Sequence, residues 1–229
     1  MILNVEVKNL SSLTIGGTSG LESADIPMTK LIFPGSTLKG VMRTSLHLAI
    51  KEWEEELKEE LRKENKEMLT SCGEIDPAFI SVAHANDKKG TCDVCSLFGF
   101  PSPNAQGRGK VSVHLEVSDR LEKVERYTLT RVKINDSTQT SEKGSLFTQE
   151  VYRPGTVFKF RIELNSNDEK DLLMVLLSLY YLRLYRVGRG GMVDLRLLND
   201  ENELCTSCGE LTKKLIKALK SWMTEGDGL

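Results

Sequence analysis

Residues 157–198, VFKFRIELNSNDEKDLLMVLLSLYYLRLYRVGRGGMVDLRLL, hold a strand, a helix and a second strand in succession. Apolar and charged residues alternate over 157–164, which is the period of a half-buried strand. Residues 168–186 are rich in apolar side chains, with acid at the start and arginine at the end, as a helix dipole favours. Gly188 lies where such a helix would stop, and residues 192–198 form a second short strand.

The segments outside this unit predict a complete sheet with helices. Residues 2–8 predict a strand, and residues 111–117 predict another from their clean alternation of apolar and polar side chains. Residues 210–223 predict a basic amphipathic helix. The order β-α-(loop)-β-β-α-β-α is typical of a ferredoxin-like sheet, so we predict an α+β fold with its helices on one face.

A long helix is predicted to begin near Ser36 or Thr37, either of which can cap it, and to run to about residue 69. Lys39 and Arg43 are four residues apart, so they share one face near the electropositive start of this helix. That face is either a track for an anion or a solvated surface. An apolar stripe runs along the helix and consists of Leu38, Met42, Leu46, Ala49, Trp53, Leu57 and Leu61.

Length and composition favour a single domain over residues 1–229, with enough apolar residues for a core. The formal net charge of −2 argues against a uniformly basic, nucleic-acid-binding surface. Much of the acid lies in residues 51–67, whereas basic residues elsewhere stand beside glycines, so a local basic groove can still form. No stretch could span a bilayer and the first residues lack the features of a signal peptide, so we expect a cytoplasmic protein.

Cys72, His84, Cys92 and Cys95 form the pattern C-x11-H-x7-C-x2-C. Two cysteines separated by two residues can bind one ion from a tight turn, and a third cysteine and a histidine complete the tetrahedron that Zn²⁺ prefers. The set lies in residues 70–110, a long segment without regular periodicity, which a metal would order. We therefore predict a structural zinc site, with free thiols and a surface histidine as the alternative.

Cys205 and Cys208 form a second C-x2-C motif. They could replace Cys72 and His84 in a four-cysteine site, act as a redox pair, or take no part in binding. We prefer the compact set of three cysteines and one histidine. The odd total of five cysteines argues against a disulfide framework and favours metal ligands or free thiols.

Residues 186–192, RVGRGGM, place glycines beside arginines between a helix and a strand. Dinucleotide-binding and Walker loops run from a strand into a helix, so this segment is neither. Glycines allow the backbone to approach a phosphate, and arginines add charge and hydrogen-bond donors. An ordinary helix C-cap is the alternative.

Four segments occur in order along most of the chain: FPGSTLKGVMR at 33–43, CDVCSLFG at 92–99, the segment 131–156, and VGRGGM at 187–192. Each is weak evidence alone, but together they resemble the repeat-associated RAMP superfamily of CRISPR effector subunits. The resemblance is greatest to its Cas7-type backbone subunits from type III complexes, often called Csm3-like.

The resemblance implies a modified RNA-recognition fold with large insertions, a zinc-stapled loop within 70–110 and a thumb-like hairpin at 128–156. Such subunits stack in several copies along a guide RNA (crRNA), together with other CRISPR complex subunits. The thumb interrupts the pairing of the guide with single-stranded target RNA. The residues implied to contact RNA are Ser36, Lys39, Arg43, Arg131, Gly188, Arg189, Gly190 and Gly191.

The resemblance also implies an activity. Csm3-like subunits cleave bound target RNA with an aspartate after the first strand, aided by a divalent cation, and Asp25 occupies the matching place. A lone carboxylate could position Mg²⁺ or another divalent cation at the scissile phosphate, or help to deprotonate the ribose 2′-OH. Glu22 is a nearby competitor. A metal-dependent endoribonuclease within the assembled complex is therefore implied.

Three other functions remain open. An architectural subunit of the same assembly would bind RNA without cleaving it. A metal-independent endonuclease for precursor RNA would use His47, His84 or His114 as acid or base. A zinc protein unrelated to RNA would fail to bind RNA even at low salt.

Overall fold

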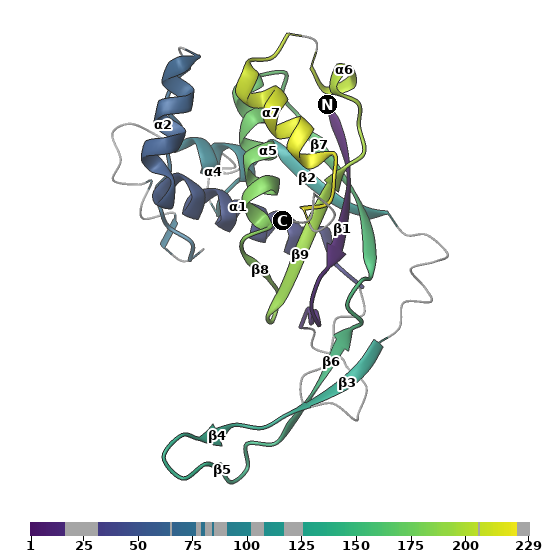
Figure 1. Ribbon diagram of the computed structural model, residues 1–229. Coiled ribbons are helices and arrows are strands. Elements are labelled where there is room, and N and C mark those ends of the chain that lie inside the picture. The colour runs from purple at the N-terminus through teal and green to yellow at the C-terminus, as the bar shows by residue number, and fades with distance from the viewer. Residues whose placement is uncertain are drawn as a thin grey trace.

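The computed structural model describes residues 1–16, 32–64, 66–76, 79–80, 84, 91–101, 108–116, 126–205 and 207–223. A sheet with helices forms the main body, and a long hairpin projects from one end of it (Figure 1). No helix in the described part of the chain combines the length and the apolar character needed to cross a membrane.

The sheet has five strands in the order β2-β7-β1-β9-β8, and every neighbouring pair is antiparallel. The strands are β1 (Ile2–Asn9), β2 (Val111–Glu116), β7 (Val157–Leu164), β8 (Arg186–Val187) and β9 (Gly191–Leu197). The first strand lies between the two strands that flank the second crossover helix, as in a ferredoxin-like fold. The predicted α+β class and the predicted strands are therefore confirmed.

Two helices pack together beside the sheet, α1 (Gly35–Glu52) and α5 (Glu169–Leu182). We call the sheet together with α1 and α5 the palm. Strand β7 shows why the core lies on one face, since Phe158 and Phe160 are fully buried whereas Lys159 is exposed. Phe33 inserts edge-on between the two phenylalanine rings, with centroid distances of 5.2 and 4.9 Å. This aromatic cluster fixes the chain just before α1.

Helix α1 begins two residues earlier than a Ser36 cap would allow, and three earlier than a Thr37 cap would. Its N-cap is Pro34, and no side chain caps it, so the predicted cap is wrong. A Cβ atom on Gly35 would lie 1.9 Å from the carbonyl oxygen of Val113 in β2. Close packing of the backbone against the sheet, rather than a side-chain cap, therefore sets the start of the helix.

The predicted single helix to about residue 69 is interrupted. The backbone leaves the helical conformation at Trp53 (φ −112°, ψ 32°), and a separate helix, α2, covers Glu54–Lys63. The Trp53 ring packs near Tyr181 of α5, with centroids 6.1 Å apart. Beyond the break, α2 is mostly charged, and Leu57 and Leu61 are the buried residues among those of α2 whose burial the structure describes.

Helix α5 ends at Leu182, before the predicted stop at Gly188. Arg183 caps it and turns inward to an ion pair with Asp194, where the Arg183 Nε lies 3.1 Å from the carboxylate. Gly188 instead lies in the turn between β8 and β9, with φ +56°. The helix C-cap interpretation of this glycine is therefore wrong.

The hairpin expected within residues 128–156 projects from the palm (Figure 1). It consists of β3 (Arg126–Arg131) paired with β6 (Phe147–Tyr152), and a short pair β4 (Ile134–Asn135) and β5 (Thr140–Ser141) near its tip. We call residues 126–152 the thumb hairpin. Its apolar side chains toward the tip, Val132, Ile134 and Leu146, are 46%, 55% and 69% exposed.

Candidate metal centre and nucleic-acid interface

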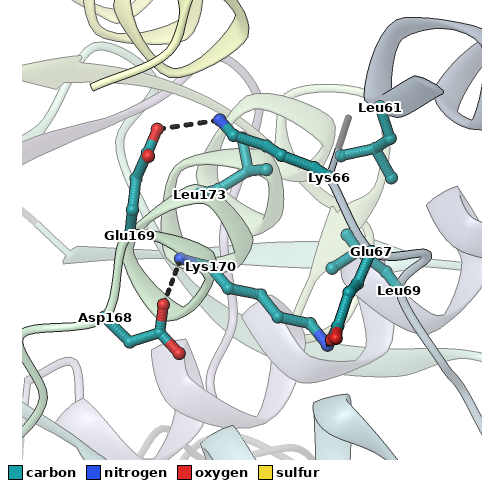
Figure 2. A pocket seen from close by; sticks show the side chains of 8 residues that line it. All are labelled: Leu61, Lys66, Glu67, Leu69, Asp168, Glu169, Lys170 and Leu173. Atoms are coloured by element: carbon teal, nitrogen blue, oxygen red, sulfur yellow. Dashed lines mark hydrogen bonds and ion pairs between the residues drawn. The ribbon is translucent and has the colours of Figure 1, made fainter. Parts of the chain in front are cut away.

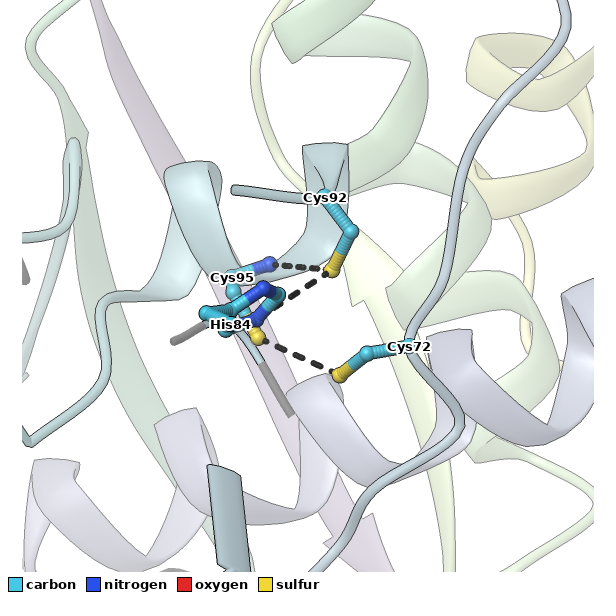
Figure 3. Close-up of side chains that lie close together, drawn as sticks. All are labelled: Cys72, His84, Cys92 and Cys95. Carbon is cyan, nitrogen blue, oxygen red and sulfur yellow. Dashed lines mark hydrogen bonds between the residues drawn. The ribbon is translucent and has the colours of Figure 1, made fainter. Parts of the chain in front are cut away.

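The predicted zinc ligands come together in the structure (Figure 3). The ligand atoms of Cys72, His84, Cys92 and Cys95 all lie within 4.8 Å of one another. The sulfurs of Cys72 and Cys95 are 3.6 Å apart, and the Cys92 sulfur is 3.9 Å from Nε2 of His84. Sulfurs at about 2.3 Å from a tetrahedral zinc ion lie roughly 3.8 Å apart, so the set has the dimensions of such a site.

A short helix and a pair of hydrogen bonds between Asp93 and Thr70 position the residues of this cluster. Cys92 is the N-cap of α4 (Asp93–Phe98), and its sulfur accepts a hydrogen bond from the backbone N–H of Cys95. Asp93 accepts hydrogen bonds from both the N–H and the hydroxyl of Thr70, at 2.8 and 2.7 Å. Because Thr70 precedes Cys72 by two residues, this link holds the third cysteine beside the C-x2-C turn.

The chemistry of the cluster suits a metal ion. A hydrogen bond from the Cys95 thiol lowers the pKa of Cys92 to about 5, so this pair readily carries a thiolate, the form that binds metal. Three sulfurs and one imidazole fill a tetrahedron and leave no position for a reactive water. The cluster could therefore hold an ion in a structural role.

Two side chains of α1 face the segment that carries Cys72. Nη2 of Arg43 donates to the sulfur of Cys95 at 3.2 Å and to the carbonyl oxygen of Glu74 at 3.4 Å. Nδ1 of His47 lies 2.6 Å from the Ser71 hydroxyl. Burial, reinforced by Arg43, lowers the pKa of His47 to about 4, so this imidazole is neutral at physiological pH.

The glycine-rich turn between β8 and β9 lies on the segment that follows β1. The N–H of Arg189 donates to the Thr14 carbonyl at 3.0 Å, and the hydroxyl of Ser11 donates to the Gly190 carbonyl at 3.3 Å. A Cβ atom on Gly188 would lie 2.3 Å from the Thr14 carbonyl oxygen, so only glycine fits. Arg189 itself is exposed, so its guanidinium is accessible at this turn.

The same segment reaches the root of the thumb hairpin. The Ser12 hydroxyl lies 2.8 Å from the Tyr127 hydroxyl, and Leu13 pairs with Tyr152. Beside Tyr127 is an open hollow of about 470 Å³, which is also lined by Arg126, Arg153 and Pro154. Sequence reasoning missed these residues, although an Arg-Tyr pair at the start of a predicted hairpin is a recognisable signal for stacking and phosphate contacts.

The sequence profile of the RAMP superfamily matches residues 6–192. The chain belongs to the RAMP superfamily. A search among curated proteins found no match. Membership of the RAMP superfamily supports a CRISPR-associated role in RNA binding. The match covers the thumb hairpin and the palm from within β1 to the start of β9.

The residues predicted to contact RNA lie on α1, the thumb hairpin and the glycine-rich turn of this RAMP protein. Ser36 is exposed in the first turn of α1, and Arg131 is exposed on the thumb hairpin. Lys39 is half-buried, and this burial lowers its pKa. Arg43 is directed toward the cysteine cluster. Helix α1 also contacts β8, the strand that leads into the glycine-rich turn.

The predicted catalytic residue Asp25 and its competitor Glu22 lie outside the described residues. The histidines proposed for metal-independent catalysis are differently placed. His47 and His84 lie at the cysteine cluster, whereas His114 is exposed on β2 and pairs in register with Arg161. His84 is one of the four residues that could hold a metal ion, and His47 is buried, so neither is arranged to meet a substrate.

Cys205 and Cys208 are joined to each other in a disulfide. The four-cysteine alternative is therefore wrong, whereas the disulfide is compatible with the redox-pair alternative for these two cysteines. The pair lies between α6 (Glu201–Leu204) and α7 (Glu210–Leu219), where spacing of three residues brings the two sulfurs together. The number of cysteines could not identify this disulfide, because five cysteines allow several pairings.

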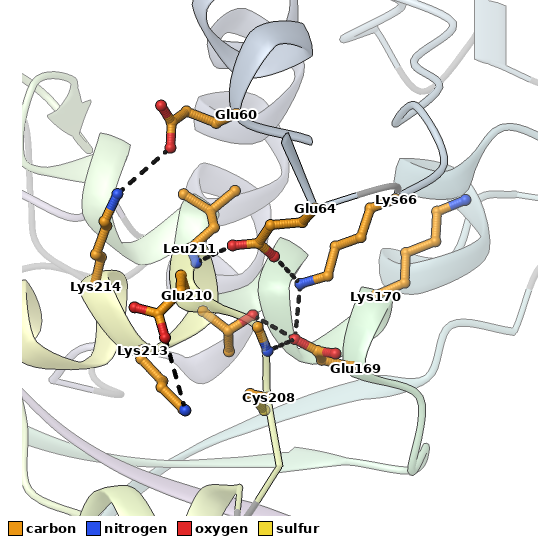
Figure 4. A network of polar contacts seen from close by, with 12 residues as sticks. Glu60, Glu64, Lys66, Glu169, Lys170, Cys208, Glu210, Leu211, Lys213 and Lys214 are labelled. Atoms are coloured by element: carbon orange, nitrogen blue, oxygen red, sulfur yellow. Dashed lines mark hydrogen bonds and ion pairs between the residues drawn. The ribbon is translucent and has the colours of Figure 1, made fainter. Parts of the chain in front are cut away.

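The disulfide leads directly into a polar contact between three helices (Figure 4). Glu169 at the start of α5 accepts hydrogen bonds from the Gly209 N–H, at 2.8 Å, and from the Thr212 hydroxyl, at 2.9 Å. Lys66 bridges Glu169 and Glu64 at 2.8 and 2.7 Å. These contacts satisfy the backbone at the start of α7 and fasten it to α5 and to the end of α2.

A hollow of about 250 Å³ lies beside this contact (Figure 2). Its floor is apolar, and its charged side chains engage one another, with Lys66 paired to Glu169 at 2.8 Å and Lys170 to Glu67 at 3.5 Å. Mutual pairing leaves the hollow with little to attract a charged ligand. We interpret it as part of the packing between helices. Its lining consists of Leu61, Lys66, Glu67, Leu69, Asp168, Glu169, Lys170 and Leu173.

Proposed function

We propose that this RAMP protein is a guide-RNA-binding backbone subunit of a type III CRISPR interference complex, of the Cas7-type, Csm3-like kind. Several copies would stack along one crRNA in the cytoplasm, next to other subunits of the complex. The cysteine cluster would hold Zn²⁺ and stabilise the loop between α2 and β2. The bound single-stranded target RNA would be cut at regular intervals.

One observation carries the binding proposal: the glycine-rich turn and the root of the thumb hairpin meet on residues 11–14. The turn offers backbone without side chains and the exposed guanidinium of Arg189, which suits a sugar–phosphate chain. The thumb root offers the Tyr127 ring, 39% exposed, for a base to stack on. Phosphate contacts and a stacking platform side by side are typical of single-strand recognition.

Lys39 supports the same proposal from α1. Partial burial lowers the pKa of this side chain, because its charge has lost part of its hydration. A phosphate placed beside it would restore a favourable partner for that charge. We propose that Ser36 and Lys39 contact the guide backbone, with Arg131, Gly188, Arg189, Gly190 and Gly191 as further contacts.

Binding of a short single-stranded RNA at several salt concentrations tests this proposal. Arg189→Gln and Lys39→Gln should each weaken binding for all sequences and reduce the salt slope by about one. Lys214→Gln, which removes an exposed charge on α7, is the matched control and should leave the slope unchanged. Equal slopes in all three variants and the native chain would contradict the proposed interface.

Cleavage is tested with the assembled complex, guide and target. We propose that Asp25 positions Mg²⁺ at the scissile phosphate, so Asp25→Ala should abolish cutting and preserve target binding. Glu22→Gln is the control for a nearby acid, and removal of Mg²⁺ by EDTA should stop cutting by the native complex. Undiminished cutting by Asp25→Ala would favour a purely architectural role for this subunit.

A further inference from the structure

Arg43 and Lys39 differ in a way that their spacing conceals. They share one helical stripe of α1, yet only Arg43 reaches the cysteine cluster, where its Nη2 is 3.2 Å from the Cys95 sulfur. The Nε atom of Arg43 is buried and has no hydrogen-bond partner among the described residues. The partly buried guanidinium is thus directed at the cysteine cluster, with its Nε atom shielded from solvent.

The net charge of a zinc ion bound at this cluster would favour the contact between Arg43 and the Cys95 sulfur. One divalent zinc ion with three thiolates and a neutral imidazole carries a net charge of about −1. A buried negative charge needs a partner, and a guanidinium that donates to a ligating sulfur supplies both charge and a hydrogen bond. Hydrogen bonds to ligands orient them and adjust the electron density that they give to the metal.

We propose that Arg43 is a positioning residue of the metal centre, which neutralises its net charge and orients the Cys95 thiolate. In this role its guanidinium does not hold a phosphate of the RNA. The inference rests on the proposed zinc site and is independent of RNA binding.

The surroundings of Arg43 support this assignment. The same Nη2 also donates to the carbonyl of Glu74, which lies two residues beyond Cys72. One turn later on α1, His47 contacts the hydroxyl of Ser71, and that hydroxyl also accepts the Gly73 N–H at 3.0 Å. Two successive turns of α1 therefore hold the segment 71–74 in place from one side, and α4 holds the ligands on the other.

Metal affinity of the full-length chain tests the proposal directly. Arg43→Met removes the charge and the donors with little change in length, whereas Arg43→Lys keeps the charge and one donor. Lys39→Met, one turn earlier on the same stripe, is the matched control. Zinc affinity is measured by competition with a chromophoric chelator, and the charge-transfer bands of the Co²⁺-substituted chain report on the thiolates.

We expect Arg43→Met to lower zinc affinity by about 10-fold or more and to shift the sulfur-to-cobalt band, with partial recovery in Arg43→Lys. Lys39→Met should change neither quantity. A native affinity and band position in Arg43→Met would overturn the proposal, and so would failure of the native chain to bind zinc or cobalt. If Arg43→Met does not fold, Arg43→Gln takes its place, and a native affinity and band position in that variant overturn the proposal equally.

RNA binding separates this inference from the proposed function. Arg43→Gln should keep the salt slope of RNA binding that the native chain shows, whereas Lys39→Gln should reduce it by about one. Arg43→Gln with a slope reduced by one and an unchanged cobalt spectrum would place Arg43 on RNA instead. A chain that binds no RNA at all would defeat the proposed function and leave the metal experiment valid.

Discussion

The chain contains two C-x2-C motifs, and the structure uses them in opposite ways. Cys92 and Cys95 lie at the start of α4 and point toward two further ligands, Cys72 and His84. Cys205 and Cys208 lie just before α7 and close on each other in a disulfide. The motif alone therefore does not decide the chemistry; what decides it is whether other ligands reach the same point.

The surroundings of the two pairs explain the difference. The first pair has Arg43 beside its sulfurs, which favours thiolate and hence metal. The second pair is followed by Gly209, whose N–H is bonded to Glu169, and its neighbourhood holds carboxylates such as Glu203. Negative charge nearby disfavours the thiolate form of these two cysteines.

Loss of a ligand from the first pair should give the largest effect. Cys72→Ser is expected to abolish tight zinc binding and to lower stability by on the order of 3 kcal/mol, because the loop that carries the ligands loses its cross-link. Metal content by elemental analysis and thermal unfolding check this. A shift in Tm of roughly 6–12 °C corresponds to that loss in a chain of this size.

Cys205→Ser is the matched control, since it changes a cysteine outside the cluster. It should retain one zinc ion per chain. Zinc lost from Cys205→Ser and kept in Cys72→Ser would reverse the roles of the two motifs.

Opening the disulfide should have a smaller effect. The ring that it closes contains four residues, so the chain-entropy contribution is at most about 2 kcal/mol. The double variant Cys205→Ser with Cys208→Ser should therefore lower Tm by a few degrees and keep native zinc content and RNA binding. Unchanged metal content with a Tm loss as large as that of Cys72→Ser would show that the second pair is the more important cross-link.

Asp93, which anchors the first cysteine pair to Thr70, should contribute less to the free energy of unfolding than the disulfide does. Asp93→Ala removes the hydrogen bonds from Thr70 and the 2.9 Å ion pair with Lys170, which is partly exposed and so contributes little. We expect a loss of about 1 kcal/mol in the free energy of unfolding, measured by urea denaturation. Thr70→Val, which removes only the hydroxyl partner of Asp93, should lose part of this free energy. An Asp93→Ala variant as stable as the native chain would show that the metal alone positions the loop.

Glu169, which accepts the Gly209 N–H just after the second cysteine pair, should have the smallest effect on stability, and that effect should depend on pH. Burial would raise the pKa of Glu169, but hydrogen bonds from Lys66, Gly209 and Thr212 outweigh it and lower the pKa overall. An unfolded-state pKa of about 4.3 means that the ionised group stabilises the fold above that pH. This contribution is lost as the pH falls through the lower, folded-state pKa.

Glu169→Gln should therefore reduce stability by about 0.5 kcal/mol at pH 7 and show a smaller further loss at pH 3 than the native chain. Urea midpoints at both pH values measure this. Glu210→Gln, at an exposed carboxylate on α7, is the control and should follow the native pH dependence. A native-like acid response in Glu169→Gln would remove this carboxylate from the anchor.

The sequence predicts the sheet well because strand alternation depends on local burial alone. The bounds of β7 over 157–164 match the prediction, and the ligand set around Cys92 follows from spacing within one loop. The break at Trp53 and the turn at Gly188 depend on contacts with α5 and with Thr14, which lie far away in the sequence. Tertiary packing of this kind overrides local propensity.

The site shows the same limit. Lys39 and Arg43 are both cations and lie one turn apart on the same face of α1, so the sequence does not distinguish their roles. In the structure they differ because Arg43 contacts the sulfur of Cys95. The pairing of Cys205 with Cys208 is local, yet the sequence could not select it, because a four-cysteine site and a redox pair both fit the same motif. Spacing identifies candidates for a ligand set, and proximity to a third residue selects among them.

Gly35 carries a consequence for how the motif that contains it should be interpreted. Since a methyl group there would collide with a carbonyl of the neighbouring strand, selection for a folded protein alone will keep glycine at this position. Ser36, the next residue, is exposed and free of that constraint. In a saturation library screened first for solubility and then for RNA binding, position 35 should be depleted in the first screen and, under the proposed function, position 36 only in the second.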